Sequence, residues 1–188
     1  MERHKEGTFL AYYPMILPHW PFQPTPDSKD WDTSETKEWP RNKWNKPHFQ
    51  DMVSYVDKMV KKVVTKLDDL GIRENTLVIF TCDNGTYVGI TSKMKDGTII
   101  KGGKGSMPDA GNRVPFIVNW PGTIKPGQVK QDIIDFSDLL PTLCDAAGAE
   151  IPAKLKLDGR SFYPLLRGNE YASREWMYMW YARNGGPK

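Results

Sequence analysis

The sequence predicts an α/β fold, and the spacing of its hydrophobic residues carries that prediction. A long amphipathic helix is predicted over Phe49–Leu70, where apolar residues recur at steps of three and four. Two continuous apolar runs, Thr76–Thr81 and Val114–Trp120, are typical of strands buried on both faces, as in parallel sheets. A second helix is predicted over Ser137–Ala147. We therefore expect a mainly parallel sheet with flanking helices.

Residues at the ends of these elements support their boundaries. Gly71 suits the C-terminal cap of the long helix, and Gly148 stands just past the predicted end of the second one. Ser137 is a suitable N-cap residue. Pro121 and Gly122 close the second strand with a turn.

The two ends of the chain and a long loop complete the predicted organisation. Phe9–Leu17 is predicted to form a first short buried strand and Glu175–Ala182 a last strand. Residues 18–48 are rich in proline and show no sustained period, which indicates a long loop of the kind that is usually functional or disordered. Aromatic rings in such a loop must pack on the protein or contact a ligand; they belong to Trp20, Trp31, Trp39 and Trp44.

Composition excludes several classes of protein. The chain has 188 residues, of which 39% are hydrophobic and 26% charged, so it is too apolar for a disordered protein. Its net charge of +3 is too small to indicate a nucleic-acid partner, and we interpret the lysines of the long helix as its solvated face. Cys82 and Cys144 form no C-x-x-C pair, which excludes a disulfide scaffold or cysteine-rich zinc site and favours two buried thiols.

Membrane and export signals are not evident in the sequence. No apolar run reaches the roughly 20 residues that span a bilayer. The apolar stretch Phe9–Tyr13 is interrupted by Pro14 and Pro18 and lacks a small-x-small cleavage site, so we do not interpret it as a signal peptide.

Two short segments could carry chemistry. Asp83-Asn84-Gly85 follows the first central strand; it could be a simple turn, or its two side-chain oxygens could bind calcium or magnesium at the carboxyl end of the strand. Lys101–Ser106 is glycine-rich and basic but lacks the spacing of a nucleotide P-loop. Its glycines and Lys104 could approach an oxyanion closely, and the alternative is a solvated loop.

The histidines give a weaker signal. His19 is held between Pro18 and Pro21 at the end of the first predicted strand. A lone histidine is more often structural than catalytic. His4 and His48 have no supporting pattern, and we expect them to be surface residues.

Taken in order, these segments resemble the second half of the catalytic region of the sulfatase family, in the alkaline-phosphatase superfamily. The similarity rests on an ordered set of motifs that spans nearly the whole chain and is more specific than any single motif. These are Pro18–Pro21 (P-H-x-P), Leu77–Gly85, Gly103–Gly105, Arg113–Pro115 leading to Trp120–Gly122, Asp138–Leu143 and Leu157–Ser161.

The resemblance implies an arylsulfatase-like hydrolysis of a sulfate ester in a partial alkaline-phosphatase-like α/β sandwich. Asp83 and Asn84 would be calcium ligands. Lys104 would bind the sulfate and the leaving-group oxygen, and His19 would do the same and could act as a general acid. Fixed positive charge at the bridging oxygen is what such a reaction needs most, because negative charge gathers there in the transition state.

The sequence departs from the family pattern in ways that bear on activity. The family's formylglycine arises within C/S-x-P-x-R, and neither Cys82 nor Cys144 is followed by x-P-x-R. The paired aspartates of the family's N-terminal part are also absent, and the usual E-G-G-x-R appears as Asp109–Arg113 with the sequence D-A-G-N-R. Calcium takes 6–8 oxygen ligands, so two side chains with water would hold it weakly. We expect the chain alone to be inactive.

Several further expectations follow from the resemblance. Residues 1–150 would be the C-terminal half of the catalytic domain, and residues 151–188 the start of a small C-terminal subdomain. The substrate would be a sulfated small molecule or carbohydrate, the location would be outside the cytoplasm, and exposed sheet edges could cause self-association. Two alternatives stay open. One is a phosphatase or phosphonate hydrolase of the same superfamily; the other is a non-catalytic carbohydrate-binding module that uses the tryptophan-rich loop.

Overall fold

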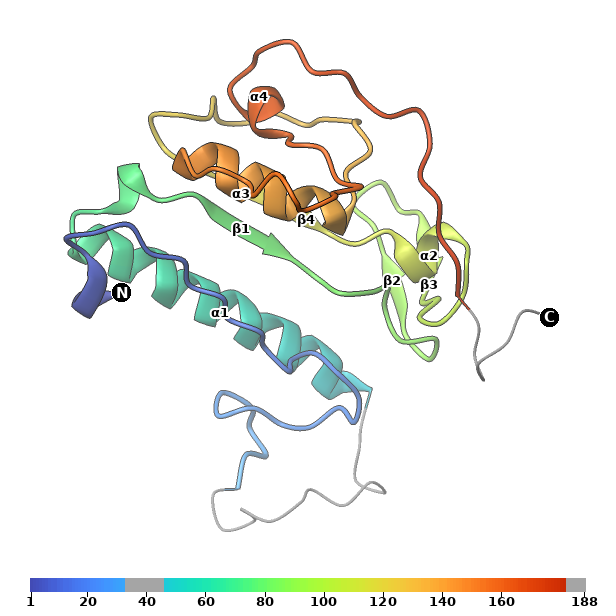
Figure 1. Ribbon diagram of the computed structural model, residues 1–188. Helices are drawn as coiled ribbons and strands as arrows, with labels where there is room; N and C mark the ends of the chain where they lie inside the picture. Colours follow the sequence, from blue (N-terminus) through green and yellow to red (C-terminus); the bar gives the residue numbers. More distant parts are fainter. Residues whose placement is uncertain (33–45, 182–188) are drawn as a thin grey trace.

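The computed structural model describes residues 1–32 and 46–181, and its longest element is the predicted helix (Figure 1). Helix α1 spans Pro47–Asp69. Its end is fixed by Gly71, which has a φ of +66° and whose N–H donates to the Asp68 carbonyl at 2.9 Å. The next N–H, of Ile72, reaches back to the Leu67 carbonyl at 3.1 Å. These two bonds form a Schellman cap, which confirms the boundary that the glycine predicts.

The strands pair in two antiparallel ladders. Strand β1 (Val78–Thr81) pairs with β4 (Phe116–Asn119), with Phe80 opposite Ile117. Strands β2 (Thr91–Lys93) and β3 (Ile99–Lys101) form a hairpin between them in the chain. The expected mainly parallel sheet is therefore not confirmed. The reason is topological: the β1-to-β4 connection is this hairpin and the short helix α2 (Asp109–Asn112), which return the chain in the opposite direction, rather than a long crossover helix.

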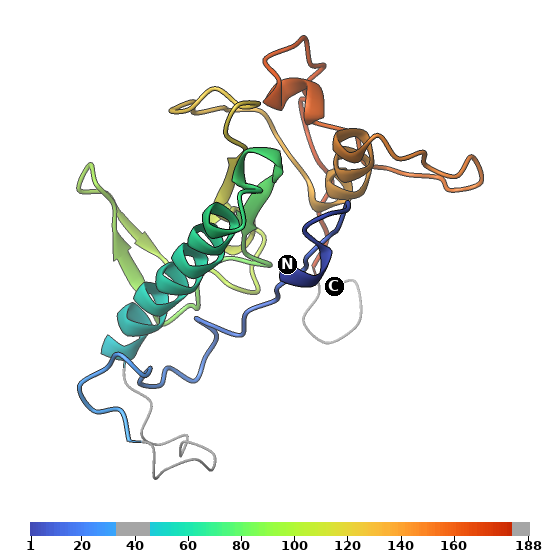
Figure 2. The same ribbon diagram turned by 90° about the vertical axis from the view of Figure 1, so that its left-hand side faces the viewer.

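Helices lie on both sides of the β1–β4 pair (Figures 1 and 2). Helix α1 lies on one side, and α3 (Leu139–Ala147) lies on the other, entered through a 3₁₀ turn, η4 (Phe136–Asp138). The α3 helix ends at Gly148 as predicted, with φ +63°, but its entry is capped by Asp135 rather than Ser137. A last short helix, α4 (Tyr163–Leu166), brings Phe162 against Phe116 of β4, with the ring centroids 5.6 Å apart.

The first and last predicted strands are wrong within the described residues. Residues 9–17 form no strand, and Tyr12 and Ile16 are 85% and 83% exposed rather than buried. Residues 175–181 likewise form no strand. An isolated bridge joins the preceding residue, Arg174, to Ile133. Both segments have strand-like composition, but no described strand is placed to pair with them, and an extended segment without a partner forms no ladder.

The central strands are also less buried than their sequence predicts. Every residue of β1 is half-buried, and β4 alternates between half-buried and exposed residues, with Ile117 58% exposed. The main buried cluster lies instead between α1 and the loops, and it consists of Phe22, Met52 and Ile90. It joins the N-terminal loop, α1 and the segment after β1, so it fixes the segments that carry the candidate site.

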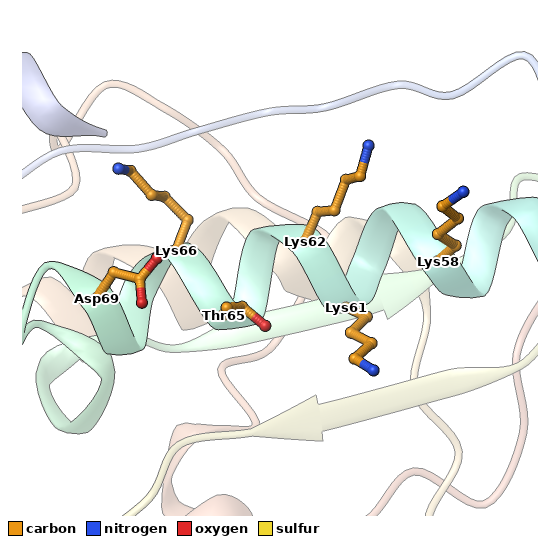
Figure 3. Close-up of a pocket in the computed structure, with 6 residues that line it drawn as sticks. All are labelled: Lys58, Lys61, Lys62, Thr65, Lys66 and Asp69. Atoms are coloured by element: carbon orange, nitrogen blue, oxygen red, sulfur yellow. The ribbon is translucent and has the colours of Figure 1, made fainter.

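The lysine-rich face of α1 is open to solvent and partly neutralised (Figure 3). Lys58 donates to both carboxylate oxygens of Asp27, at 2.6 and 2.7 Å, and Lys66 pairs with Glu2. The two ion pairs also tie the N-terminal segment along the helix. In the part of the chain that the structure describes, no helix is both long and apolar enough to cross a membrane.

Candidate functional site

The candidate site is assembled where four glycines let three backbone segments touch. The segment after β1, the loop after β3 and helix α2 meet at Gly85, Gly102, Gly103 and Gly111. A Cβ at Gly85 would stand 2.0 Å from the Ala110 carbonyl oxygen, and one at Gly102 would stand 2.0 Å from the Tyr87 carbonyl oxygen. Only glycine permits so close an approach of backbone to backbone. The glycines therefore fix the segments that carry Asn84 and Lys104 against each other.

Backbone hydrogen bonds hold this junction in register. The Lys104 N–H donates to the Thr86 carbonyl at 2.9 Å, and the Gly85 N–H donates to the Gly111 carbonyl at 2.8 Å. The Gly102 N–H donates to the Ile90 carbonyl at 2.8 Å, which continues the β2–β3 hairpin into the loop. The Lys104 backbone is thus tied to the segment that begins with Asp83.

Side chains from α2 and from the loop after β3 add further hydrogen bonds to this junction. The Asn112 amide donates to the carbonyls of Ser106, at 3.1 Å, and Met107, at 2.6 Å. The Ser106 hydroxyl donates to the Gly103 carbonyl at 2.5 Å. Asn112 and Ser106 therefore hold the loop that follows Lys104 against α2.

Asp83 and Asn84 lie just past the end of β1, as the sequence predicts. Asp83 is exposed and Asn84 is half-buried. Within the described residues the Asp83 carboxylate takes part in no ion pair or side-chain hydrogen bond, so both its oxygens are available. A carboxylate next to an amide oxygen is a donor set that fits calcium or magnesium, although two side chains fill only part of the coordination shell.

Cys82, directly before Asp83, is unsuited to act as a nucleophile. It is a free, half-buried cysteine, and burial, followed by the charge of Asp83, raises the pKa of its thiol. A raised pKa keeps the sulfur protonated near neutral pH, whereas a reactive cysteine needs the thiolate. Cys144 is also free and half-buried, so both cysteines are thiols as predicted, but neither is fully buried.

His19 is held beside this junction through its neighbour Trp20. The Trp20 ring stacks on Tyr87, with centroids 6.5 Å apart, and Tyr87 belongs to the segment that receives Gly102. His19 itself is exposed, and its Nδ1 donates to the Trp20 carbonyl at 2.5 Å. That bond places a proton on Nδ1 and leaves Nε2 as the nitrogen available to a ligand.

The segments that carry the four predicted residues are linked to one another, but the side chains of these residues do not contact one another. Lys104 and Asn84 are linked through adjacent backbone, and His19 through the Trp20–Tyr87 stack. Among the described residues, the structure records no hydrogen bond or ion pair that joins His19, Asp83, Asn84 and Lys104.

The tryptophan-rich loop has a structural role in its described part. Trp20 packs against the buried cluster through Tyr87, whereas Trp31 is 44% exposed. Trp39 and Trp44 lie outside the described residues. In the described part of the loop, Trp20 is thus in contact with protein and Trp31 is exposed.

The last two motifs of the resemblance, Asp138–Leu143 and Leu157–Ser161, meet at the buried carboxylate of Asp138. Asp138 is fully buried and accepts hydrogen bonds from the N–H groups of Arg160, at 2.7 Å, and Asp135, at 2.8 Å. Its partner of opposite charge is Arg174, whose side chain is 13% exposed. Gly159 lies so close to Ser137 that a Cβ would stand 1.9 Å from its carbonyl oxygen. These motifs therefore hold the region after β4 together rather than carry chemistry.

One polar cluster was missed by the sequence analysis. His48, expected at the surface, is 7% exposed and lies between the carboxylates of Asp30 and Asp51. The residues come from a loop and from the first turns of α1, so only the fold brings them together. In the sequence, only the three-residue step from His48 to Asp51 on the predicted helix indicates that these two side chains are neighbours.

Comparison with known proteins identifies the family. The Sulfatase family profile matches residues 1–149. The chain is 38% identical to the steryl-sulfatase of Mus musculus over 130 residues, which cover 66% of this chain and 21% of that protein. It is also 38% identical to arylsulfatase A of Homo sapiens over 132 residues, covering 70% of this chain and 26% of that protein.

Solved structures give the same result at the level of the fold. The structure of Ps i-CgsB superposes with a TM-score of 0.62 at 31% identity, covering 82% of this chain and 32% of that chain. The structure of BT4656, in complex with its substrate D-glucosamine-2-N,6-O-disulfate, superposes with a TM-score of 0.59 at 25% identity, covering 74% of this chain and 27% of that chain.

The chain spans about a quarter of the length of the curated relatives described here, 21% of one and 26% of the other. The order of motifs, the α/β arrangement and the matched region, which exceeds half of the chain, agree with one another. The chain belongs to the sulfatase family.

Proposed function

We propose that this chain supplies the calcium-binding and sulfate-binding part of an arylsulfatase-like active site that hydrolyses a sulfate ester. The glycine junction is the observation that carries the proposal, because it fixes Lys104 beside the segment of Asp83 and Asn84. Residues 1–150 contribute these groups as part of a catalytic domain, and residues 151–188 begin a C-terminal subdomain. The location inferred from the resemblance is outside the cytoplasm.

The role of each residue follows from its chemistry. Lys104 is a compact positive charge that binds the sulfate and stabilises the oxygen that leaves with the alcohol. His19, with Nδ1 engaged by the Trp20 carbonyl, presents Nε2 to the same oxygen and can give it a proton. Asp83 and Asn84 would hold a calcium ion, which, when bound, would screen the charge of the sulfate oxygens.

The residues present do not fit the family's nucleophile. No C/S-x-P-x-R motif surrounds either cysteine, and the raised pKa of Cys82 keeps its thiol protonated. We therefore derive no covalent step, and we propose that this chain binds a sulfate ester without hydrolysing it. Exposed apolar residues on the segments 10–16 and 176–181 are suited to pack against a further polypeptide or a second copy.

A binding and turnover experiment tests this proposal. The 188-residue chain is incubated with an aryl sulfate and with a 6-sulfated glucosamine, in calcium, beside the unsulfated glucosamine. We expect no release of sulfate, and weak binding of the sulfated sugar that falls about tenfold or more in Lys104→Ala, because a charge-assisted contact is lost.

The control variant is Lys95→Ala, which removes the same charge from the exposed hairpin between β2 and β3. It should bind as the unaltered chain does. Release of sulfate that disappears in Lys104→Ala would contradict the proposed inactivity, and equal binding by both variants would contradict the role of Lys104.

The phosphatase or phosphonate hydrolase alternative is not favoured by any contact near Asp83. Enzymes of that kind usually bind two metal ions with additional histidines. In the described residues, the group of three potential metal ligands that contains a histidine lies at the start of α1 rather than at the end of β1.

A further inference from the structure

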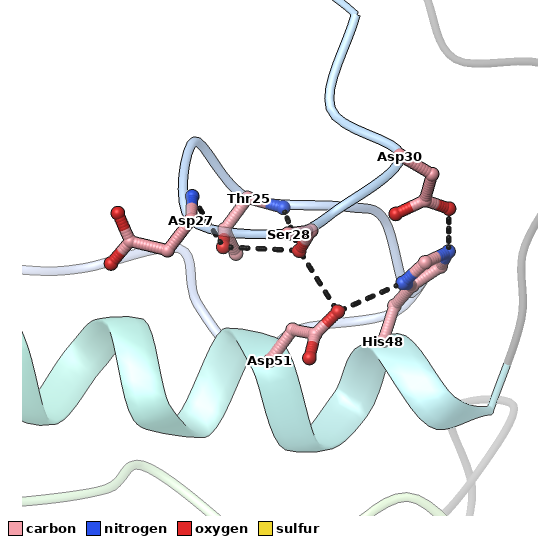
Figure 4. Close-up of polar contacts among 6 residues, drawn as sticks. All are labelled: Thr25, Asp27, Ser28, Asp30, His48 and Asp51. Atoms are coloured by element: carbon pink, nitrogen blue, oxygen red, sulfur yellow. Dashed lines mark hydrogen bonds and ion pairs between the residues drawn. The ribbon is translucent and has the colours of Figure 1, made fainter.

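A separate group of metal-binding side chains lies where the N-terminal loop meets the start of α1 (Figure 4). His48 Nε2 is 3.1 Å from Asp30 Oδ2, and His48 Nδ1 is 3.1 Å from Asp51 Oδ2. One ligand atom from each of the three residues lies within 4.8 Å of the others. Two carboxylates thus flank the two nitrogens of one imidazole.

The surroundings suit a bound ion with water in its shell. The His48 side chain is 9% exposed, so the protein fixes the imidazole, whereas Asp30 and Asp51 are 57% and 42% exposed. The Ser28 hydroxyl donates to Asp51 Oδ2 at 2.8 Å, and the Thr25 N–H in turn donates to Ser28 Oγ at 2.9 Å. Such supporting hydrogen bonds orient the ligands of known metal sites.

The charge of the cluster also favours a cation. Within the described residues, Asp30 and Asp51 have no lysine or arginine partner; the nearby Lys58 is paired with Asp27 instead. Two carboxylates therefore face one imidazole.

We propose that His48 Nε2 and Asp30 bind a divalent transition-metal ion, for which Zn²⁺ is the best-suited candidate, at a site separate from the sulfatase residues, with Asp51 holding the other imidazole nitrogen. Zinc takes imidazole nitrogen and carboxylate oxygen at about 2.0–2.2 Å. Two such ligands in tetrahedral geometry stand about 3.3 Å apart, close to the present spacing of Asp30 Oδ2 and His48 Nε2. With the ion on Nε2, Asp51 accepts from Nδ1–H and so orients the imidazole, while water fills the remaining positions around the ion.

A bound ion at this place would join two segments that are distant in sequence. Asp30 lies in the loop that follows the Thr25–Ser28 turn, and His48 and Asp51 lie in the first turns of α1. The same loop leads back to Phe22 in the main buried cluster. The metal would therefore fasten the N-terminal loop, which also carries His19, to the longest helix.

Titration of the full chain with Co²⁺, followed by Zn²⁺, tests the site. Co²⁺ that is bound by four nitrogen and oxygen ligands in tetrahedral geometry absorbs visible light through its d–d transitions. We expect a band that saturates at one equivalent and is removed by Zn²⁺. His48→Gln should abolish the band, and Asp30→Asn should weaken binding about tenfold or more.

Asp57→Asn is the matched control, because it makes the same charge change at an exposed position of α1 that lies outside the cluster. It should bind Co²⁺ as the unaltered chain does. Asp30→Asn alters a side chain that is 57% exposed, so it decides the outcome if His48→Gln unfolds the protein. A missing band, or a band unchanged by Asp30→Asn, would overturn the proposal. The cluster would then only join the loop to α1 through hydrogen bonds.

Discussion

Replacing Asp138 by alanine is expected to lower the free energy of unfolding by about 3–5 kcal/mol. The carboxylate is fully buried and accepts hydrogen bonds from Arg160 N–H and Asp135 N–H in addition to its ion pair with Arg174. Its removal leaves the guanidinium of Arg174, which is 13% exposed, without its charge partner in a poorly solvated place. Breaking one side of a buried ion pair is among the most destabilising single changes in proteins.

Urea unfolding followed by circular dichroism measures this effect. Asp158→Ala is the control, because Asp158 is exposed and lies in the same motif as Arg160, and it should change stability by no more than about 0.5 kcal/mol. An Asp138→Ala variant as stable as Asp158→Ala would show that the buried carboxylate does not hold the region after β4 together.

The second large effect is expected at the glycine junction. Gly102→Ala should destabilise the protein by about 2–3 kcal/mol, the upper end of the range for overpacking, because the added Cβ would stand 2.0 Å from the Tyr87 carbonyl oxygen. Neither neighbour can yield easily, since both are backbone. The strand-like hydrogen bond from Gly102 to Ile90 and the loop that carries Lys104 would have to shift together.

Thermal or urea unfolding of Gly102→Ala beside Gly7→Ala measures the penalty. Gly7 has no atom within 4 Å of its ideal Cβ, and its φ is not positive, so alanine there should be tolerated. If Gly102→Ala were as stable as Gly7→Ala, the close approach that builds the candidate site would not exist in solution.

Local sequence signals predicted the helices and central strands well. The period of apolar residues and the glycine after it located α1 and its cap, and Gly148 located the end of α3. The β2–β3 hairpin was missed, although Asp96-Gly97 at its tip is a recognised turn signal; Gly97 there has a φ of +88°. Strand direction could not be predicted, because apolar runs carry no information on which segment pairs with which.

The site was predictable only in part. The order of motifs selected Asp83, Asn84, Lys104 and His19, and the structure brings the segments that carry them together. The glycines before Lys104 were interpreted as allowing close approach to an oxyanion. Their contacts with the Tyr87 and Ala110 backbone could not be predicted, because they join segments that are distant in sequence. The burial of His48 could not be predicted either, because the loop that covers it carries Asp30, which lies 18 residues earlier in the sequence.

Calcium titration of the ¹⁵N-labelled chain, followed by NMR, tests most directly whether this chain carries the metal-binding and sulfate-binding part of a sulfatase site. We expect amide shifts at Asn84, Gly85 and Lys104 that saturate at about millimolar calcium, since two side chains fill only part of the shell. Asp83→Asn should remove these shifts, and Asp96→Asn, at the exposed hairpin tip, should keep them. Shifts that survive Asp83→Asn, or calcium that leaves the junction unchanged, would contradict the account.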